Sequence, residues 1–238
     1  MKKKVMMIIG ATKGLGRALA WHYGNKGYDL AITARTDSEL VALKGELEKT
    51  GTRVVAIAGD MSNPNDVERF VGVAFSIYKK VDILINNASI FGPGPKLLLD
   101  YPNEAFKEVV LTNTLIPYLV TKQVLPGMIM EGEGIVITLT SEAGHTGFSG
   151  WGAYGISKFA VEGLVQTWAD ECEDTGVRFH LVDPGEMDTE MHKQAVPDCD
   201  YELDEPSQRL AVFDYLLEIG AENGSREEAV LYQQREEN

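Results

Sequence analysis

The chain has 238 residues, and its 22 Lys plus Arg against 36 Asp plus Glu give a formal net charge of −14. A chain of this length can bury a sizeable core without a metal or disulfide staple, and its 44% apolar content is ordinary for a globular protein. We therefore expect one domain over residues 1–238. Its negative charge repels phosphate groups, which excludes nucleic acid and anionic membrane surfaces as expected partners.

The cysteines and the N-terminal residues indicate the expected cellular location of the protein. Cys172 and Cys199 lie far apart without a C-x-x-C spacing, so we expect reduced thiols, no metal site and a cytoplasmic protein. The apolar run Val5–Ile9 is shorter than the roughly 7 residues that a signal peptide needs. Runs of about 18 apolar residues are absent from the sequence, so no membrane span is expected.

Short apolar runs alternate with longer helical stretches along the chain. The expected strands are Val5–Ile9, Leu30–Ala34, Val54–Ala58, Ile83–Asn86, Ile135–Thr140 and Val177–Val182, and the expected helices are Leu15–Lys26, Ser38–Thr50, Pro64–Lys79, Asn103–Met130 and Ala153–Glu173. Continuous Val- and Ile-rich runs indicate strands buried on both faces. This alternation predicts an α/β fold, a doubly wound, Rossmann-like parallel sheet flanked by helices on both faces. Ligands bind such sheets at the carboxyl ends of the strands.

Three further segments are distinctive. Residues 91–95 hold two prolines and two glycines, which indicates a loop. Residues 186–206 hold eight acidic residues and a single lysine, and we expect them to form a substrate lid over the edge of the sheet. The polar tail after Gly220 is expected to end in a short strand around Ala229–Tyr232.

A glycine-rich turn follows the first expected strand. Residues 10–16 read Gly-Ala-Thr-Lys-Gly-Leu-Gly, and the absence of side chains at the glycines allows a tight turn and close approach to a pyrophosphate. The next helix would offer free N–H groups to the same anion. Such a turn also occurs without a ligand, but its place between a first strand and a helix favours a dinucleotide site. The expected contacts are Gly10, Thr12, Lys13, Gly14, Leu15 and Gly16.

The charges near this turn bear on the type of cofactor. Arg35 follows the second strand, where a carboxylate would favour NAD, and Lys13 can reach the same space. Two cations there favour the 2′-phosphate of NADP(H), unless both are ordinary surface charges and the cofactor is NAD. Asp60, followed by Met61, ends the third strand and is placed to accept the adenine amino group, or else to cap the helix that begins at Pro64.

Tyr154 and Lys158 are spaced so that a helix places them on one face. A free phenol, with a pKa of about 10, is too weak an acid for proton transfer near neutral pH, but a neighbouring cation lowers that pKa. Tyr118 and Lys122 repeat the spacing, so position must decide between the pairs. Tyr154 follows Ser141 at a strand end, whereas we interpret Tyr118 as a helix-surface or subunit-contact residue.

Two polar residues complete the expected catalytic set. Ser141 can donate a hydrogen bond to a carbonyl oxygen, or can simply cap the next turn. Asn113 lies in a long helix, where its amide could hold a water that touches Lys158 or could be an ordinary polar helix residue. Each residue alone is weak evidence for catalysis, and both become candidates only together with Tyr154 and Lys158.

Together these residues resemble the short-chain dehydrogenase/reductase family in its single-domain form. The resemblance runs from about Val5 to Met191. Its motifs are the glycine turn, Asp60, Asn86-Asn87-Ala88, Asn113, Ser141, Tyr154, Lys158, and Pro184-Gly185 followed by Thr189. Several ordered motifs at family-like spacing make the resemblance specific.

The resemblance implies pro-S hydride transfer at nicotinamide C4, with Tyr154 as general acid/base. It further implies that Ser141 positions the carbonyl, that Lys158 lowers the phenol pKa and holds the nicotinamide ribose, and that Asn113 anchors a relay water. The implied cofactor lining includes Asn87, Ala88, Pro184, Gly185, Met187 and Thr189.

This sequence departs from the family pattern at three points. Ile9 stands where a threonine is usual, and Ser89 replaces a glycine, but neither removes a catalytic group. The C-terminus lacks the Asp-Gly-Gly ending that often supports a second subunit interface. Since family members associate through two long helices, we expect a homodimer, with a tetramer as the less favoured assembly.

The substrate side is expected to be largely apolar. Its candidate residues are Phe91, His145, Phe148, Trp151 and Met191, each of which could instead be a packing residue. The function predicted from the sequence is NADP(H)-dependent interconversion of a small carbonyl and a secondary alcohol. The alternatives are an NAD-dependent enzyme of the same class and a non-catalytic nucleotide-sensing or scaffold protein on the same fold.

Overall fold

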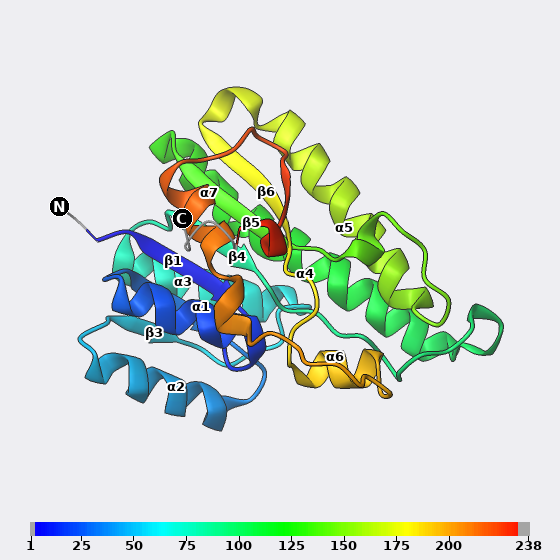
Figure 1. Cartoon of the computed structure of the whole chain (residues 1–238). Helices are drawn as coiled ribbons and strands as arrows, with labels where there is room; N and C mark the ends of the chain where they lie inside the picture. The colour runs from blue at the N-terminus through cyan, green and yellow to red at the C-terminus, as the bar shows by residue number, and fades with distance from the viewer. Residues whose placement is uncertain (1–2, 233–238) are drawn as a thin grey trace.

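A computed structural model describes residues 3–232, which form a seven-stranded parallel sheet (Figure 1). Its order is β3-β2-β1-β4-β5-β6-β7. The strands are β1 Val5–Ile9, β2 Asp29–Thr33, β3 Val54–Ala56, β4 Ile83–Asn86, β5 Gly134–Leu139, β6 Val177–Asp183 and β7 Arg226–Glu228. The doubly wound parallel sheet is thus confirmed. The order reverses between β1 and β4, and this switch point opens a crevice beyond the carboxyl ends of the strands.

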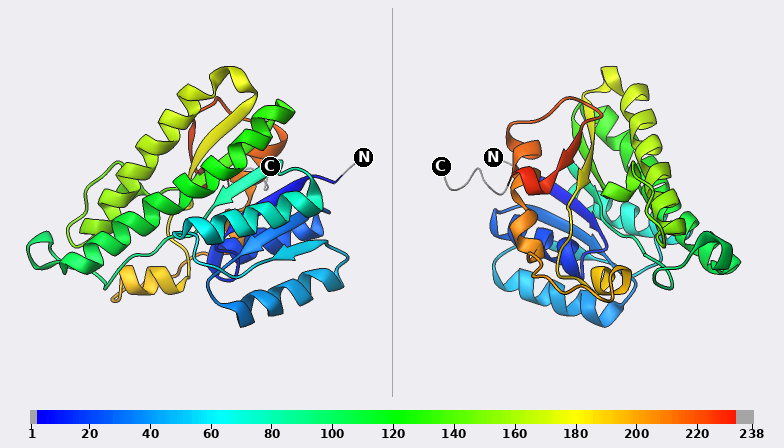
Figure 2. Two further views of the ribbon diagram at one scale, coloured as in Figure 1. Left: turned by 180° about the vertical axis from the view of Figure 1, so that it is seen from behind. Right: turned by 45° about the vertical axis from the view of Figure 1, so that its right-hand side comes forward.

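Helices cover both faces of the sheet (Figure 2). One face carries α1 Gly14–Asn25, α2 Asp37–Lys49 and α7 Ala211–Glu218, and the other carries α3 Pro64–Tyr78, α4 Asn103–Glu131 and α5 Gly152–Glu171. A shorter helix, α6 Glu190–Ala195, lies within the expected lid. Helices α6 and α7 were not among the expected elements, because such short helices carry little periodic signal. Within residues 3–232, no helix has the length and apolar run required to cross a membrane.

The central strands have no polar face because both sides of the sheet are covered. In β1, Met6 and Ile8 pack into the layer of α1, α2 and α7, while Met7 and Ile9 pack into the layer of α3, α4 and α5. All five residues of β1 are buried. Continuous apolar runs in the sequence therefore correspond to central parallel strands, as expected.

The expected C-terminal strand at Ala229–Tyr232 is wrong in position. Residues Arg226–Glu228 form β7, and Ala229–Leu231 form a single 3₁₀ turn. β7 pairs with Leu181–Asp183 of β6. β6 ends there because the next residue, Pro184, has no N–H to extend the ladder. The polar strand was overlooked because it carries none of the apolar pattern that marks the others.

Candidate active site

A cleft of about 1900 Å³ runs along the carboxyl ends of the strands. It brings together nearly all of the residues that the sequence singled out. Those lining it are Gly10, Thr12, Lys13, Gly14, Leu15, Arg35, Asp60, Met61, Asn87, Ala88, Phe91, Ser141, His145, Phe148, Trp151, Tyr154, Lys158, Pro184, Gly185, Met187, Thr189 and Met191. Gly16 and Asn113 do not line the cleft and act from behind it. The first half of the acidic segment, residues 186–195, also lines the cleft.

The glycine turn is shaped by close backbone contacts. Gly10 has a φ of +81°, and a Cβ at this position would lie 3.0 Å from Ala88 Cα. A Cβ at Gly16 would overlap the Gly10 carbonyl oxygen, which accepts a hydrogen bond of 2.8 Å from Asn87 Nδ2. Gly16 is therefore required where α1 crosses the turn, not for contact with the cleft.

The start of α1 suits an anionic ligand. Lys13 stands at the N-cap position, and its side chain makes no capping hydrogen bond. The first N–H groups of a helix have no intrahelical partner, and here they face a cleft lined by glycines. The shape of the turn and the chemistry of its donors thus fit the pyrophosphate of a dinucleotide.

Two cations line the cleft near the glycine turn. Arg35 follows β2, is exposed, and makes no ion pair with any residue of the described chain. Lys13 Nζ lies 3.0 Å from Glu190 Oε2 and 3.5 Å from Glu39 Oε1. These contacts raise the pKa of Lys13. Lys13 therefore has carboxylate partners of its own, a feature that the sequence argument did not include.

Asp60 lies in the cleft but makes local contacts as well. Its Oδ1 accepts hydrogen bonds from Ser62 N at 2.9 Å and from Ser62 Oγ at 2.8 Å. The N-cap of α3 is Asn63, whose side chain accepts from Asn65 N, so the alternative interpretation of Asp60 as the helix cap is wrong. Its contact with adenine stays a prediction.

Tyr154 and Lys158 lie one turn apart on α5, at the floor of the cleft. They are only 8% and 3% exposed. Lys158 Nζ lies 5.5 Å from the centroid of the Tyr154 ring and donates a hydrogen bond of 2.8 Å to the Leu139 carbonyl at the end of β5. The helix and the strand end thus meet at these two side chains.

The charge states of this pair differ from the sequence-based expectation. Burial raises the pKa of Tyr154 to about 12, although a hydrogen bond from the Ser141 hydroxyl acts in the opposite direction. Burial lowers the pKa of Lys158 to about 8, against the opposing effect of Asp183 and Glu162. Removal from water therefore outweighs the expected lowering of the phenol pKa by the lysine. Near pH 7 the phenol keeps its proton, and most of the amine is charged.

Ser141 and Asn113 have defined positions. Ser141 Oγ accepts a hydrogen bond of 3.3 Å from Ala143 N, and the residue lines the cleft, so it both caps the turn and faces the site. Asn113 Oδ1 accepts from Ile90 N at 2.8 Å, and its Nδ2 donates to Ile90 O and Ser157 Oγ, both at 2.9 Å. This amide therefore ties α4 to α5 and to the loop after β4. Its role in a water relay stays a prediction.

The second tyrosine–lysine pair is remote from this chemistry. Lys122 Nζ donates to Tyr118 Oη at 3.3 Å, and the Tyr118 ring stacks on Trp168. Tyr118 does not line the cleft. Position in the fold therefore separates two pairs that have the same spacing in the sequence.

Aromatic rings surround Tyr154 on the substrate side. The Phe91 and Trp151 ring centroids lie 5.2 Å and 5.8 Å from that of Tyr154, and Phe148 packs on Trp151 at 5.6 Å. Phe91 is buried, whereas Phe148 is 39% exposed at the mouth. His145 is exposed and contacts Thr146, as a loop residue would. The rings that pack against Tyr154 are thus apolar, and their contact with a substrate stays a prediction.

A buried ion network behind the site was not predicted. Arg226 of β7 donates to Glu162 Oε1 at 3.0 Å, to Asp183 Oδ2 at 2.9 Å and to the Ser141 carbonyl at 3.2 Å. Glu162 lies one turn after Lys158 on α5, a spacing that could have drawn notice. Nothing in the sequence marked Arg226 as a residue of the site, because the strand that carries it was expected at Ala229–Tyr232.

Comparison with known proteins defines the family. A model of the short chain dehydrogenases matches residues 4–200. The chain is 31% identical over 199 residues to a chloroplastic NADPH-dependent aldehyde reductase-like protein of Arabidopsis thaliana, covering 79% of this chain and 74% of that protein. The chain belongs to the short-chain dehydrogenase/reductase family.

Solved structures of other proteins have the same fold as this chain. A Pseudomonas syringae protein assigned to the short chain dehydrogenases is 31% identical, with a TM-score of 0.90 over 96% of this chain and 95% of that one. A single-substitution variant of actinorhodin polyketide ketoreductase, solved with NADPH, is 26% identical, with a TM-score of 0.87 over 95% of each chain. Both share the fold described above.

The contacts of Gly16 lead to a prediction. Gly16→Ala forces the new methyl group against the Gly10 carbonyl, so we expect NADPH binding to be lost and the unfolding free energy to fall by about 1–3 kcal/mol. Gly45→Ala is the matched control, since a Cβ at that helical position meets no atom within 4 Å. It should stabilise the protein by up to about 1 kcal/mol. Calorimetric titration and thermal denaturation test both variants, and equal behaviour would contradict the assignment.

Proposed function

We propose that this protein is an NADP(H)-dependent carbonyl reductase or secondary-alcohol dehydrogenase in which Tyr154 is the general acid/base. The observation that carries this proposal is that the Ser141 and Tyr154 hydroxyls line the same cleft, with Lys158 one turn along α5 and its Nζ 5.5 Å from the Tyr154 ring centroid. Two hydroxyls that converge beside an apolar, aromatic wall can hold one carbonyl oxygen while its carbon remains accessible. The proposal also draws on the named activity of the Arabidopsis relative.

The dinucleotide, when bound, supplies the hydride. The chain's own residues bind and protonate the carbonyl oxygen of the substrate. Ser141 and Tyr154 donate hydrogen bonds to the carbonyl oxygen, which gains negative charge as its carbon is reduced, and Tyr154 then passes its proton to that oxygen. A phenol with a raised pKa is still protonated near pH 7, and this state is the one that a reduction requires. The charged amine of Lys158 stabilises the phenolate that remains.

Preference for NADP(H) would rest on Arg35 and Lys13. Arg35 is exposed at the end of β2 and, within residues 3–232, has no carboxylate partner to compete with a 2′-phosphate. Lys13 would share its charge between that phosphate and its partners Glu39 and Glu190. We therefore assign the larger part of the preference to Arg35. The NADPH in the actinorhodin ketoreductase structure supports the same cofactor.

The substrate side suits a small, uncharged molecule. Phe91, Trp151 and Met191 offer apolar contact beside Tyr154, and residues 186–195 would form the inner surface of the lid. Carboxylates such as Glu142 and Glu186 line the rim of the cleft. These features favour neutral aromatic or aliphatic carbonyls over polyanionic substrates.

The catalytic assignment is tested by Tyr154→Phe. This change removes the proton donor while leaving the ring in place, so turnover should fall by about 10²- to 10⁴-fold with NADPH binding retained. NADPH absorbance with a panel of neutral aldehydes and ketones gives the rate. Tyr118→Phe, in the other pair of equal spacing, is the matched control and should keep wild-type turnover. Equal rates for the wild type and Tyr154→Phe would refute the assignment.

Cofactor preference is tested by Arg35→Ala. Loss of a charge-assisted contact to the 2′-phosphate should raise the KM for NADPH by about 10- to 100-fold. The KM for NADH, which lacks this phosphate, should stay the same. An unchanged KM for NADPH would show that the charge argument is wrong and would favour an NAD-dependent enzyme.

Assembly as a homodimer is proposed from the surfaces of α4 and α5. Leu111, Ile156 and Phe159 are 56%, 42% and 49% exposed on these helices, which lie side by side (Figure 2). Burial of such residues against a second copy would stabilise a dimer. Sedimentation equilibrium should give twice the mass of the 26.2 kDa chain, and Leu111→Glu should shift it toward the monomer. A monomeric wild type at micromolar concentration would contradict the proposal.

A further inference from the structure

A single arginine joins four segments behind the candidate active site. Arg226 projects from the edge strand β7, and its side chain is 19% exposed. Its guanidinium reaches Glu162 on α5 at 3.0 Å, Asp183 at the end of β6 at 2.9 Å and the Ser141 carbonyl beyond β5 at 3.2 Å. It also pairs with Glu228 of its own strand at 3.1 Å.

The two carboxylates in this network are themselves buried and accept further hydrogen bonds. Asp183 and Glu162 side chains are each 10% exposed. Glu162 Oε1 also accepts a hydrogen bond of 2.7 Å from Thr140 Oγ1, and Asp183 Oδ1 accepts one of 3.0 Å from Gly185 N. The network therefore links the catalytic helix, the strand end that carries Ser141, and the Pro184–Gly185 turn. Buried carboxylates are costly without a cation, and Arg226 supplies the positive charge that pairs with both of them.

These charges act on the acid/base pair. Asp183 and Glu162 both favour the charged form of Lys158, and Asp183 disfavours ionisation of Tyr154. The charged groups that face Tyr154 and Lys158 are thus Asp183 from β6 and Glu162 from α5. Arg226 from β7 acts on them through its ion pairs with both carboxylates. The Arg226 guanidinium pairs with both carboxylates, so its positive charge opposes theirs next to this pair.

We propose that Arg226 is a positioning residue for the acid/base centre, which fixes the Ser141 main chain and balances the buried charge of Asp183 and Glu162 beside Lys158 and Tyr154. This inference rests on the proposed function for its catalytic meaning, but its electrostatic part does not require turnover. A residue near the C-terminus would in this way set the pH at which residues of α5 exchange protons.

The sign of the effect follows from the loss of one positive charge. Arg226→Met leaves Asp183 and Glu162 without their shared cation. The uncompensated negative charge makes Tyr154 and Lys158 hold their protons more tightly. The pKa of Lys158 should rise by about one unit, and the basic limb of the pH–rate profile should move by a similar amount. The kcat for reduction should fall by up to about tenfold near pH 7, because a phenol that holds its proton more tightly is a weaker general acid. The KM for NADPH should change little, because Arg226 touches no residue of the glycine turn.

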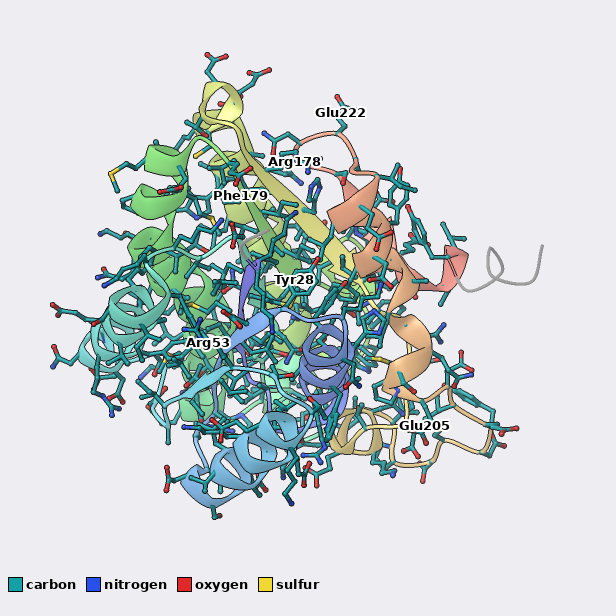
Figure 3. The ribbon with its side chains drawn as sticks, turned by 90° about the vertical axis from the view of Figure 1, so that its left-hand side faces the viewer. Tyr28, Arg53, Arg178, Phe179, Glu205 and Glu222 are labelled. Atoms are coloured by element: carbon teal, nitrogen blue, oxygen red, sulfur yellow. The ribbon has the colours of Figure 1, made fainter. Side chains whose placement is uncertain are left out.

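The pKa of Lys158 can be measured directly by side-chain NMR of lysine-labelled protein, with the resonance assigned by its absence in Lys158→Arg. Arg53→Met is the matched control. Arg53 pairs with the buried Asp29 at 3.2 Å, beside the opposite edge strand β3. Figure 3 shows Arg53 next to the blue strands, away from the reddish C-terminal segment. Its loss should lower stability without moving the Lys158 titration.

A charge-balanced variant separates electrostatics from damage to the fold. Arg226→Met combined with Glu162→Gln removes one charge of each sign, and the pKa of Lys158 should return toward the wild-type value. Arg226→Lys keeps the charge and should shift the titration less than Arg226→Met. If Arg226→Met does not fold, the double variant is compared with Glu162→Gln, since loss of Arg226 in that background should raise the pKa of Lys158, and equal titrations would overturn the proposal.

The outcomes are distinct. A raised Lys158 pKa in Arg226→Met with recovery in the double variant supports the proposal. An unchanged titration accompanied by a lower melting temperature, as in Arg53→Met, overturns it and leaves Arg226 a structural residue. If the titration shifts as expected but no carbonyl is reduced by NADPH, the proposed function fails while the charge balance stands.

Discussion

The burial of one ammonium group constrains the whole site. Lys158 is 3% exposed, and its Nζ donates to the carbonyl of Leu139 where β5 ends. A buried charge is tolerated only where hydrogen bonds and opposite charges replace water. The strand end supplies the hydrogen bond, and Asp183 and Glu162 supply the negative charge. These carboxylates in turn require Arg226, so the edge strand β7 is tied to the chemistry on α5.

The fold explains why these groups meet. In a parallel sheet all strands end at one edge, and the reversal of strand order between β1 and β4 opens a crevice there. The glycine turn after β1, the loop after β4 and Ser141 after β5 therefore share one cleft. Gly16 allows α1 to cross the turn at close range, and Asn113 fastens α4 to α5 behind it.

Sequence patterns predicted the structure best in segments whose side chains are completely buried. The continuous apolar runs of the central strands and the glycine turn predicted the sheet and the cofactor end of the cleft. They failed at β7, a polar strand of three residues whose partner residues are fixed by where β6 ends. They also gave the wrong direction for the pKa of Tyr154, because spacing on a helix identifies a neighbouring cation but not the loss of water around both groups.

The sequence by itself therefore determined the fold class and located the glycine turn and the tyrosine–lysine pair that line the cleft, because each depends on local periodicity or on residues close in the chain. The tertiary structure alone decided that Tyr154 and Lys158 are buried, and that Lys13 is held by Glu39 and Glu190. It also decided that Arg226 sits between Asp183 and Glu162. Burial and long-range charge pairing depend on which distant segments pack together, and no local pattern records that information.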